Sequence, residues 1–258
     1  MRAYFEKPRS TVGWKGLIND PGLDESFDVN RGLRTARRLL LDISALGLPV
    51  GCEFLDPITP QFIADTVTWG SIGARTAASQ VHRQLVSGLS MPVGIKNGTD
   101  GDVQVAVDGI RAAGAPHVFM GINGDGLAAL VRTTGNPDAH VILRGGSAGP
   151  NYSAADVADA RTRLADAGLP ERVVVDASHG NSRKDHVRQA EVVREIAGRI
   201  GAGDRGVTGL MMESFLVAGS QPLGGALTYG QSVTDRCLSW DTTATLLDEL
   251  AAAVRARR

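Results

Sequence analysis

The chain has 258 residues, of which 43% are hydrophobic, and its 27 Lys and Arg nearly balance its 28 Asp and Glu. The length suits one large α/β domain, and the balanced charge argues against a protein that binds nucleic acid or membrane surfaces through its net charge. With no apolar run near the roughly 20 residues of a membrane span, and only Cys52 and Cys237, the sequence predicts a cytoplasmic protein without disulfides.

Short apolar runs alternate with amphipathic stretches along the chain. Seven of these runs are predicted strands: Arg2–Phe5, Pro49–Leu55, Gly70–Ala74, Pro92–Lys96, His117–Ile122, Arg172–Ser178 and Val207–Glu213. Several are continuous Val, Ile, Met and Gly runs, which is typical of parallel strands buried on both faces. Two more extended segments, Ala128–Thr133 and Ala139–Arg144, are interpreted as an extra pair and not as another strand–helix unit.

The stretches between the strands have helical patterns. Asn30 is expected to cap the first long helix, and Ser153 followed by Asp156 predicts a capping box at another. Apolar residues at helical spacing predict a helix over His186–Ile200, and Asp241–Arg257 is expected to be the closing helix.

This order of elements predicts a parallel sheet, either a closed barrel or an open doubly wound sheet. No G-x-G-x-x-G follows a strand, which disfavours a dinucleotide-binding sheet. Six polar residues end or follow predicted strands, where a barrel gathers its functional side chains: Glu53, Arg75, Lys96, Arg144, His179 and Glu213. We therefore expect a single domain over residues 1–258 of the (β/α)8 TIM-barrel type. Its first strand is expected to be missing, because only seven strands are counted.

Cations occupy comparable places in successive strand–helix units: Arg2, Lys7, Arg9, Arg75, Lys96 and Arg144. Arginine forks bind phosphate or carboxylate in a bidentate manner, and lysine acts as a movable point charge, so this set would suit two anionic substrates. The alternative for any single member is an ordinary solvated cation. That alternative is weakest for Arg75, Lys96 and Arg144, which end apolar strands beside glycines.

A second set consists of His179, Glu213 and Asp235. One imidazole and two carboxylates would suit Mn²⁺, Fe²⁺ or Zn²⁺, although their spacing is not a local motif, and a hydrogen-bonded histidine with capping carboxylates is the alternative. Cys237 lies two residues after Asp235 and is interpreted either as a small buried side chain or as a thiolate near the metal.

Short motifs that contain most of these candidate residues occur in one order along the chain. They are Glu-Lys-Pro-Arg-Ser (6–10) within the stretch 2–21, Glu-Phe-Leu-Asp (53–56), Gly-Ala-Arg-Thr (73–76), Lys-Asn-Gly-Thr-Asp-Gly (96–101), Leu-Arg-Gly-Gly (143–146), Pro-Asn-Tyr (150–152), Ser-His-Gly-Asn-Ser (178–182), Met-Glu-Ser (212–214) and Gly-Gln-Ser-Val-Thr-Asp (230–235). In these motifs the sequence resembles the type I 3-deoxy-D-arabino-heptulosonate 7-phosphate (DAHP) synthases of the feedback-regulated microbial subgroup. The Lys-Pro-Arg-Ser run favours this family over the related synthases of eight-carbon sugar-acid phosphates.

The resemblance implies a metal-dependent transferase that condenses phosphoenolpyruvate with erythrose 4-phosphate, the first step of the shikimate pathway to aromatic amino acids. By position it assigns phosphoenolpyruvate to Arg2, Arg75, Lys96 and Arg144, erythrose 4-phosphate to Lys7, Arg9 and Ser10, and a divalent metal (Mn, Fe, Co or Zn) to His179, Glu213 and Asp235. Glu53 would order the attacking water and Lys7 would donate a proton, so that Lys7, Glu53 and His179 form the implied catalytic set.

The family's upstream Gly-Pro-Cys-Ser-Ile-His-Asp segment, with its cysteine metal ligand and first barrel strand, has no counterpart here. Three interpretations follow: a DAHP synthase missing its upstream part, a short paralogue in secondary metabolism in which Cys237 partly replaces the missing thiolate, or a catalytically impaired module that still binds phosphoenolpyruvate. An open barrel exposes strand edges, so we expect a homo-oligomer or a partner that covers them.

Overall fold

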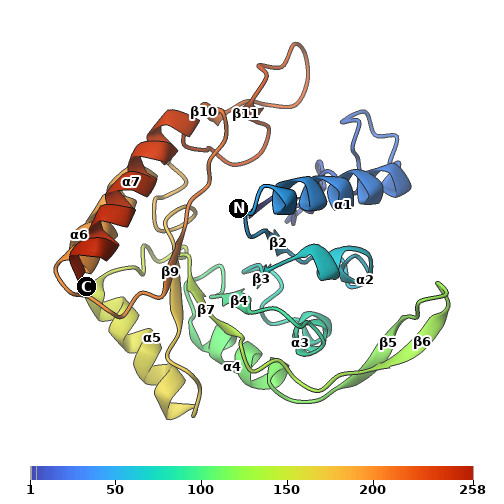
Figure 1. Ribbon diagram of the computed structural model, residues 1–258, viewed down its shortest axis with the longest axis horizontal. Helices are drawn as coiled ribbons and strands as arrows, with labels where there is room; N and C mark the ends of the chain where they lie inside the picture. Colours follow the sequence, from blue (N-terminus) through green and yellow to red (C-terminus); the bar gives the residue numbers. More distant parts are fainter. Residues whose placement is uncertain (1, 4, 258) are drawn as a thin grey trace. The chain divides into compact units, whose positions relative to one another are not determined.

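The computed structural model describes residues 2–3 and 5–257, with side chains from residue 5 onward. The fold is mixed α/β (Figure 1), and the chain divides into two compact units. The first comprises Met1–Gly98 with Gln104–His140, and the second comprises Thr99–Val103 with Val141–Arg258. The expectation of a single domain stays a prediction.

The first unit contains parallel strands that follow one another in chain order. They are β1 (Arg2–Ala3), β2 (Gly51–Glu53), β3 (Trp69–Ile72) and β4 (Val93–Lys96). Each pairs in parallel with the next, for example Cys52 with Gly70 and Ser71 with Gly94. Every residue of β2 and β4 is buried, as expected for parallel strands covered on both faces.

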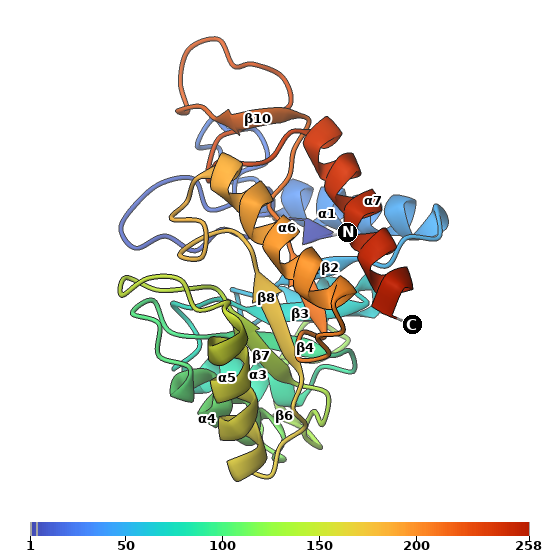
Figure 2. The ribbon, with the colours of Figure 1, turned by 90° about the vertical axis from the view of Figure 1, so that its left-hand side faces the viewer.

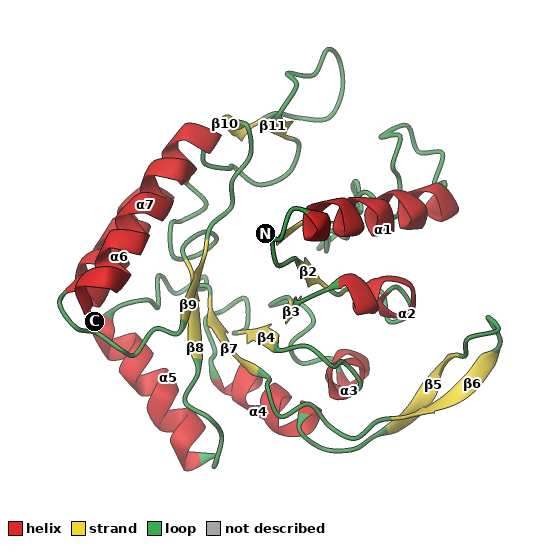
Figure 3. Cartoon of the chain, in the orientation of Figure 1, coloured by secondary structure: helices red, strands yellow, loops and turns green. Residues whose placement is uncertain are grey.

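Two of the strand predictions are wrong in their pairing. Strand β5 (Val118–Ile122) pairs antiparallel with β6 (Ala128–Arg132) and forms a two-stranded ribbon (Figure 3). Strand β7 (His140–Leu143) pairs instead in parallel with β8 (Val173–Asp176). The physical reason is burial: residues along β5 and β6 alternate in exposure, which suits a hairpin, whereas β7 is buried throughout.

The parallel strands of the second unit are β7, β8 and β9 (Gly209–Met211), and a short parallel pair follows, β10 (Val217–Ser220) with β11 (Gln231–Ser232). Its core includes the buried Val141, Leu143, Val173 and Val175 of β7 and β8. The structure therefore confirms an α/β fold with parallel strands, while closure into an eight-stranded barrel stays a prediction.

Helices alternate with these strands. The first unit has α1 (Val29–Ala45), α2 (Pro60–Ile63), the short 3-10 helix η1 (Ala64–Thr66), α3 (Gln80–Ser87) and α4 (Gln104–Ala113), and the second has α5 (Ala154–Asp166), α6 (His186–Gly201) and α7 (Trp240–Arg257). Helices α6 and α7 pack side by side (Figure 2). Among the residues that the structure describes, no helix combines the length and apolar character needed to cross a membrane.

The helix ends test two of the cap predictions. The capping box of α5 is confirmed, because the Ser153 hydroxyl accepts from the backbone N–H of Asp156 while the Asp156 carboxylate accepts from that of Ser153. The cap predicted at Asn30 is wrong. Helix α1 begins earlier, because the Asp28 carboxylate already accepts from the backbone N–H of Arg31.

Polar residues stand at or just after the carboxyl ends of the parallel strands, as predicted. Glu53 and Lys96 are the last residues of β2 and β4, and Arg144 directly follows β7. His179 and Glu213 follow β8 and β9 by three and two residues respectively. Each unit thus carries some of the candidate residues at its strand ends.

Candidate functional site

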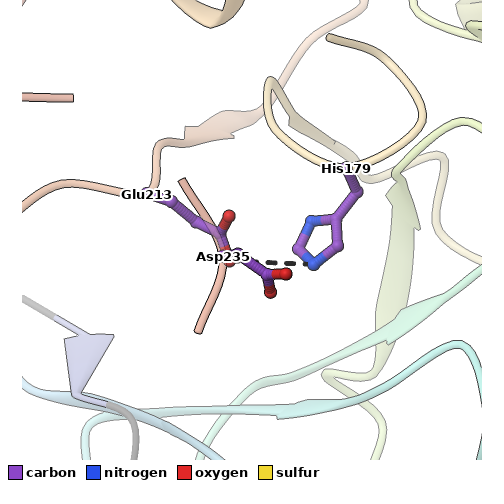
Figure 4. Close-up of side chains that lie close together, drawn as sticks. All are labelled: His179, Glu213 and Asp235. Carbon is purple, nitrogen blue, oxygen red and sulfur yellow. Dashed lines mark ion pairs between the residues drawn. The ribbon is translucent and has the colours of Figure 1, made fainter. Parts of the chain in front are cut away.

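In the second unit, His179, Glu213 and Asp235 point toward one another (Figure 4). One ligand atom from each side chain lies within 4.8 Å of the others, and His179 Nε2 is 3.7 Å from Glu213 Oε1. Glu213 is buried and the other two are partly buried. An imidazole nitrogen and two carboxylate oxygens are the donors that first-row divalent metals accept, so the donor set fits such an ion.

The buried Gln189 of α6 holds the backbone at Glu213. Its Oε1 accepts from the Glu213 N–H at 2.6 Å, and its Nε2 donates to the Glu213 carbonyl at 3.3 Å. The backbone N–H of Leu238 also donates to that carbonyl, at 2.9 Å. The segments that carry Glu213 and Asp235 are therefore tied together through their backbones.

The loop that carries His179 has an unusual backbone. His179 has a φ of 55°, and its carbonyl accepts from the backbone N–H of Lys184 at 2.7 Å. The next residue, Gly180, donates its N–H to the carbonyl of Arg144 at 2.9 Å. A side chain at Gly180 would meet the backbone of Gly145 and Gly146. The candidate metal ligand His179 and the candidate substrate residue Arg144 are thus joined by tightly packed backbone.

The pocket around this group contains cations as well as acids. Lys184 and Arg236 line it together with Ser178 and Ser182. Lys184 is exposed just before α6, so it is a solvated cation at a helix start that also lines this pocket. Cys237 is buried, and its Sγ donates to the Asp235 carbonyl at 3.5 Å. It is not a member of the His179 group within the described residues, which favours the interpretation as a small buried side chain.

In the first unit, the segment Phe5–Ile18 carries the residues assigned to erythrose 4-phosphate. The backbone N–H of Ile18 donates to the Phe5 carbonyl at 3.0 Å, and that of Lys7 donates to the Lys15 carbonyl at 2.8 Å. Gly16 closes the loop at a φ of 109°, and a Cβ there would lie 2.5 Å from the Phe5 carbonyl oxygen. Only glycine therefore fits at this crossing of the backbone.

A buried acid, Glu6, anchors this segment to the loop after β2. Its carboxylate accepts from the backbone N–H groups of Leu55 and Asp56 at 3.1 and 3.2 Å, and from the Thr59 hydroxyl at 2.9 Å. Burial raises the pKa of Glu6 to about 7, although these hydrogen bonds favour the charged form and act in the opposite direction. Glu6 precedes the candidate catalytic Lys7, which is itself buried.

Candidate residues of the first unit also contact one another and their neighbours through their side chains. Arg75 Nε donates to the Ser10 hydroxyl at 2.9 Å, so a residue assigned to phosphoenolpyruvate contacts one assigned to erythrose 4-phosphate. Arg9 Nε donates to the Trp14 carbonyl at 2.8 Å. Glu53 packs against the bare Cα of Gly73, where any Cβ would overlap its carboxylate.

Lys96 at the end of β4 is buried, with 3% of its surface exposed, and Arg144 is partly buried. The side chain of Arg2 lies outside the described residues, although its backbone belongs to β1. The structure therefore brings together Ser10 with Arg75, and His179 with Glu213 and Asp235.

Sequence reasoning missed three polar residues that hold this machinery in place. They are Glu6, Asp176 and Gln189, and all three are buried. Asp176 could have been found, because a carboxylate at the end of the apolar run Val-Val-Val requires a partner when it is buried. Glu6 and Gln189 contact residues far away in sequence, so no local signal marks them.

Comparison with known proteins identifies the family. A model of the DAHP synthetase I family matches residues 1–248. The chain is 59% identical to a phospho-2-dehydro-3-deoxyheptonate aldolase of Corynebacterium glutamicum and 56% identical to the Phe-sensitive enzyme of that name from Escherichia coli K12, covering all of this chain and 72% and 74% of theirs. A solved structure of such an aldolase from Francisella tularensis is 52% identical and superposes with a TM-score of 0.97, over all of this chain and 76% of the other.

These matches agree with the motifs on which the resemblance was based. The family's members are DAHP synthases, transferase-type enzymes of the shikimate pathway that use phosphoenolpyruvate and erythrose 4-phosphate. The synthase interpretation is thereby favoured over that of a module that only binds phosphoenolpyruvate. The chain belongs to the DAHP synthetase I family.

Proposed function

We propose that this chain joins phosphoenolpyruvate to erythrose 4-phosphate through the residues described above. Arg75, Lys96 and Arg144, with Arg2, bind the phosphate and carboxylate of phosphoenolpyruvate. Arginine forks and a lysine charge match these anionic groups and place the enol carbon for attack.

Segment Phe5–Ile18 binds the second substrate. Arg9 and Ser10 engage the phosphate of erythrose 4-phosphate, and Lys7 stands at its aldehyde. The contact between Ser10 and Arg75 supports adjacent binding of the two substrates. Holding both in one orientation removes much of the entropic cost of a reaction between two molecules.

Carbon–carbon bond formation is the first chemical step. C3 of phosphoenolpyruvate bonds to the aldehyde carbon, and Lys7 transfers a proton to the aldehyde oxygen. His179, Glu213 and Asp235 would hold a divalent ion, for which Mn²⁺, Fe²⁺, Co²⁺ and Zn²⁺ are all suitable. When bound, such an ion would supply Lewis-acid polarisation of a carbonyl.

In the second step, water adds to the cationic C2. Glu53 orients this water and accepts one of its protons. The C2–O bond to phosphate then breaks, the C2 hydroxyl gives its remaining proton to the departing phosphate, and the C2 carbonyl forms. The balance is phosphoenolpyruvate plus erythrose 4-phosphate plus water giving DAHP plus inorganic phosphate. Glu53 is buried, with 7% of its surface exposed, which suits a base that must orient a single water.

The single observation that carries this proposal is the His179–Glu213–Asp235 group, whose donor atoms lie within 4.8 Å of one another in one pocket. Such a donor set at the strand ends of a DAHP synthetase I chain is suited to a catalytic metal ion. The proposal is tested by phosphate release from phosphoenolpyruvate and erythrose 4-phosphate in the presence of Mn²⁺.

The Lys7→Ala variant is the decisive comparison in that assay. We expect phosphate release to fall by about 10²–10⁴-fold, the usual contribution of a positioned proton donor, while the far-ultraviolet circular dichroism stays unchanged. Arg38→Ala removes an exposed cation from α1 and serves as the matched control, with unchanged turnover expected. Equal turnover of Lys7→Ala and the parent chain would refute the role of Lys7.

A further inference from the structure

A buried carboxylate stands behind the candidate metal ligands. Asp176 ends β8 with 1% of its surface exposed. Its Oδ1 accepts from Ser178 twice, from the backbone N–H at 3.0 Å and from the hydroxyl at 2.5 Å. Its Oδ2 lies 2.9 Å from Nδ1 of His179. Both carboxylate oxygens therefore face the loop that carries the histidine.

These contacts favour one position for the proton of the imidazole. A carboxylate accepts hydrogen bonds, so Oδ2 at 2.9 Å favours the tautomer that carries its hydrogen on Nδ1. Ser178 Oγ is also 2.7 Å from Nδ1, and since the hydroxyl proton is directed to Asp176 Oδ1, this oxygen can only accept from Nδ1–H. The opposite tautomer would set a bare nitrogen against a carboxylate oxygen.

A neutral imidazole has one N–H, so a proton on Nδ1 leaves the lone pair on Nε2. Nε2 is also the nitrogen that faces Glu213, at 3.7 Å. Metal ions bind only the unprotonated nitrogen, and the hydrogen bond at the other nitrogen sets which one that is.

We propose that Asp176 is a positioning residue that holds His179 as its Nδ1–H tautomer and presents Nε2 to the metal. This inference rests on the proposed metal role of His179. The backbone around the histidine is already held by the bond from Lys184 to the His179 carbonyl and by the bond from Gly180 to Arg144, so rotation and tautomer exchange of the ring are the freedoms that Asp176 removes.

Replacing Asp176 by asparagine should move the ring proton of His179 to the other nitrogen. Two donors from Ser178 converge on one oxygen of residue 176, so the amide oxygen of an asparagine takes that position and its NH₂ faces Nδ1. The NH₂ group donates to Nδ1, and the proton of the ring moves to Nε2. Asp176→Asn therefore blocks the nitrogen that faces the metal site while keeping the shape of the side chain.

The first experiment needs neither metal nor turnover. The chain without metal is labelled with ¹⁵N-histidine, and the tautomer is read from two-bond ¹H–¹⁵N correlations at a pH at which the ring is neutral, with His179→Ala identifying the resonance. We expect Nδ1–H for His179 in the parent chain and Nε2–H in Asp176→Asn. An Nε2–H tautomer in the parent chain would overturn the proposal, and this measurement does not depend on the folding of any Asp176 variant.

The second experiment measures Mn²⁺ binding by isothermal titration calorimetry. Asp176→Asn should weaken binding about 10–100-fold, as is typical when the partner behind a metal ligand is lost. Asp204→Asn is the matched control, because Asp204 also accepts from backbone and side chain in the same unit, and its Mn²⁺ affinity should change less than twofold.

The outcomes separate the two proposals. If His179→Ala binds Mn²⁺ as tightly as the parent chain, the metal role of His179 fails, and the proposed function loses its main support. If His179→Ala loses Mn²⁺ but a folded Asp176→Asn keeps the parent affinity and tautomer, only the positioning role of Asp176 is refuted.

Discussion

The loop that carries His179 and the segment Phe5–Ile18 both hold candidate functional residues in place, but through different contacts. Both depend on glycines where backbone meets backbone, at Gly145 and Gly180 for the former and at Gly16 for the latter. In the His179 loop, however, the functional side chain itself is held, by Asp176 and Ser178.

In Phe5–Ile18 the tie to the loop after β2 runs through Glu6, a neighbour of the functional residues, while the side chains of Arg9 and Ser10 also make hydrogen bonds within the unit. Glu6 ties the segment to the loop after β2, while Arg9 is partly exposed and Ser10 is exposed. The difference suits the two tasks, because a metal ion needs ligands in one geometry, whereas a sugar phosphate must enter, react and leave. The following variants test this comparison, starting with the largest expected effect.

His179→Ala removes a candidate ligand from the held loop. Mn²⁺ affinity should fall by more than the roughly 10–100-fold that follows loss of a partner behind a ligand. Phosphate release should fall with it, while the fold persists. Metal content by elemental analysis after dialysis gives the measurement, and His186→Ala, at the start of α6, is a histidine control expected to retain metal. Equal metal content in both variants would contradict the ligand role.

Gly145→Ala tests how far the His179 loop depends on close backbone packing. A Cβ at this position, where φ is 71°, would lie 2.5 Å from backbone atoms of Gly180 and Asn181. The free energy of unfolding should fall by about 4 kcal/mol, from the left-handed backbone and from overpacking together.

Gly168 offers the control, with a φ of 68° and open space around it. Gly168→Ala should cost only about 1–2 kcal/mol in urea unfolding, because strain of the left-handed backbone acts there without a clash. Equal losses of unfolding free energy in the two alanine variants would mean that the close backbone contact at Gly145 adds nothing to the cost of the left-handed backbone.

Glu6 makes the anchoring of Phe5–Ile18 dependent on pH. Its pKa rises from the usual 4.5 to about 7 in the folded chain, chiefly through burial. The folded state thus holds the proton more tightly than the unfolded state. The stability from Glu6 is complete below pH 4.5 and is lost as the pH rises toward 7, by on the order of 3 kcal/mol.

Urea unfolding at pH 4.5 and pH 8 measures this loss, and Glu6→Gln is the comparison because glutamine does not titrate. Subtracting the two pH dependences removes the contribution of the other carboxylates. The parent chain should lose more stability than Glu6→Gln between these pH values. Identical pH dependences would show that Glu6 titrates normally in the folded chain.

The smallest effect is expected at an exposed ion pair outside both regions. Arg37 and Asp65 contact each other at 2.6 Å with 41% and 65% of their side chains exposed. This contact lowers the pKa of Asp65, but solvent screens the pair. Asp65→Asn should change the free energy of unfolding by less than about 1 kcal/mol, and less still in high salt. A larger change in urea unfolding would show that surface charge matters here as much as the buried anchors.

Much of the site could be predicted from local pattern. The placement of Glu53, Lys96 and Arg144 at strand ends follows from apolar runs that stop at a charge. The pairing of strands could not be predicted with the same success, since Val118–Ile122 and His140–Leu143 are similar apolar runs with different partners. Exposure of one face, visible only in the folded chain, separates them.

By itself the amino-acid sequence determined the α/β class, the motifs of the family and the identity of the candidate donors, because these depend on residue type and short-range order. The tertiary structure decided which donors meet. His179, Glu213 and Asp235 are distant in sequence, and their approach depends on the turn at His179 and on Gln189 behind Glu213. The role proposed for Asp176 likewise depends on which nitrogen its carboxylate faces, a distance that no spacing in the sequence contains.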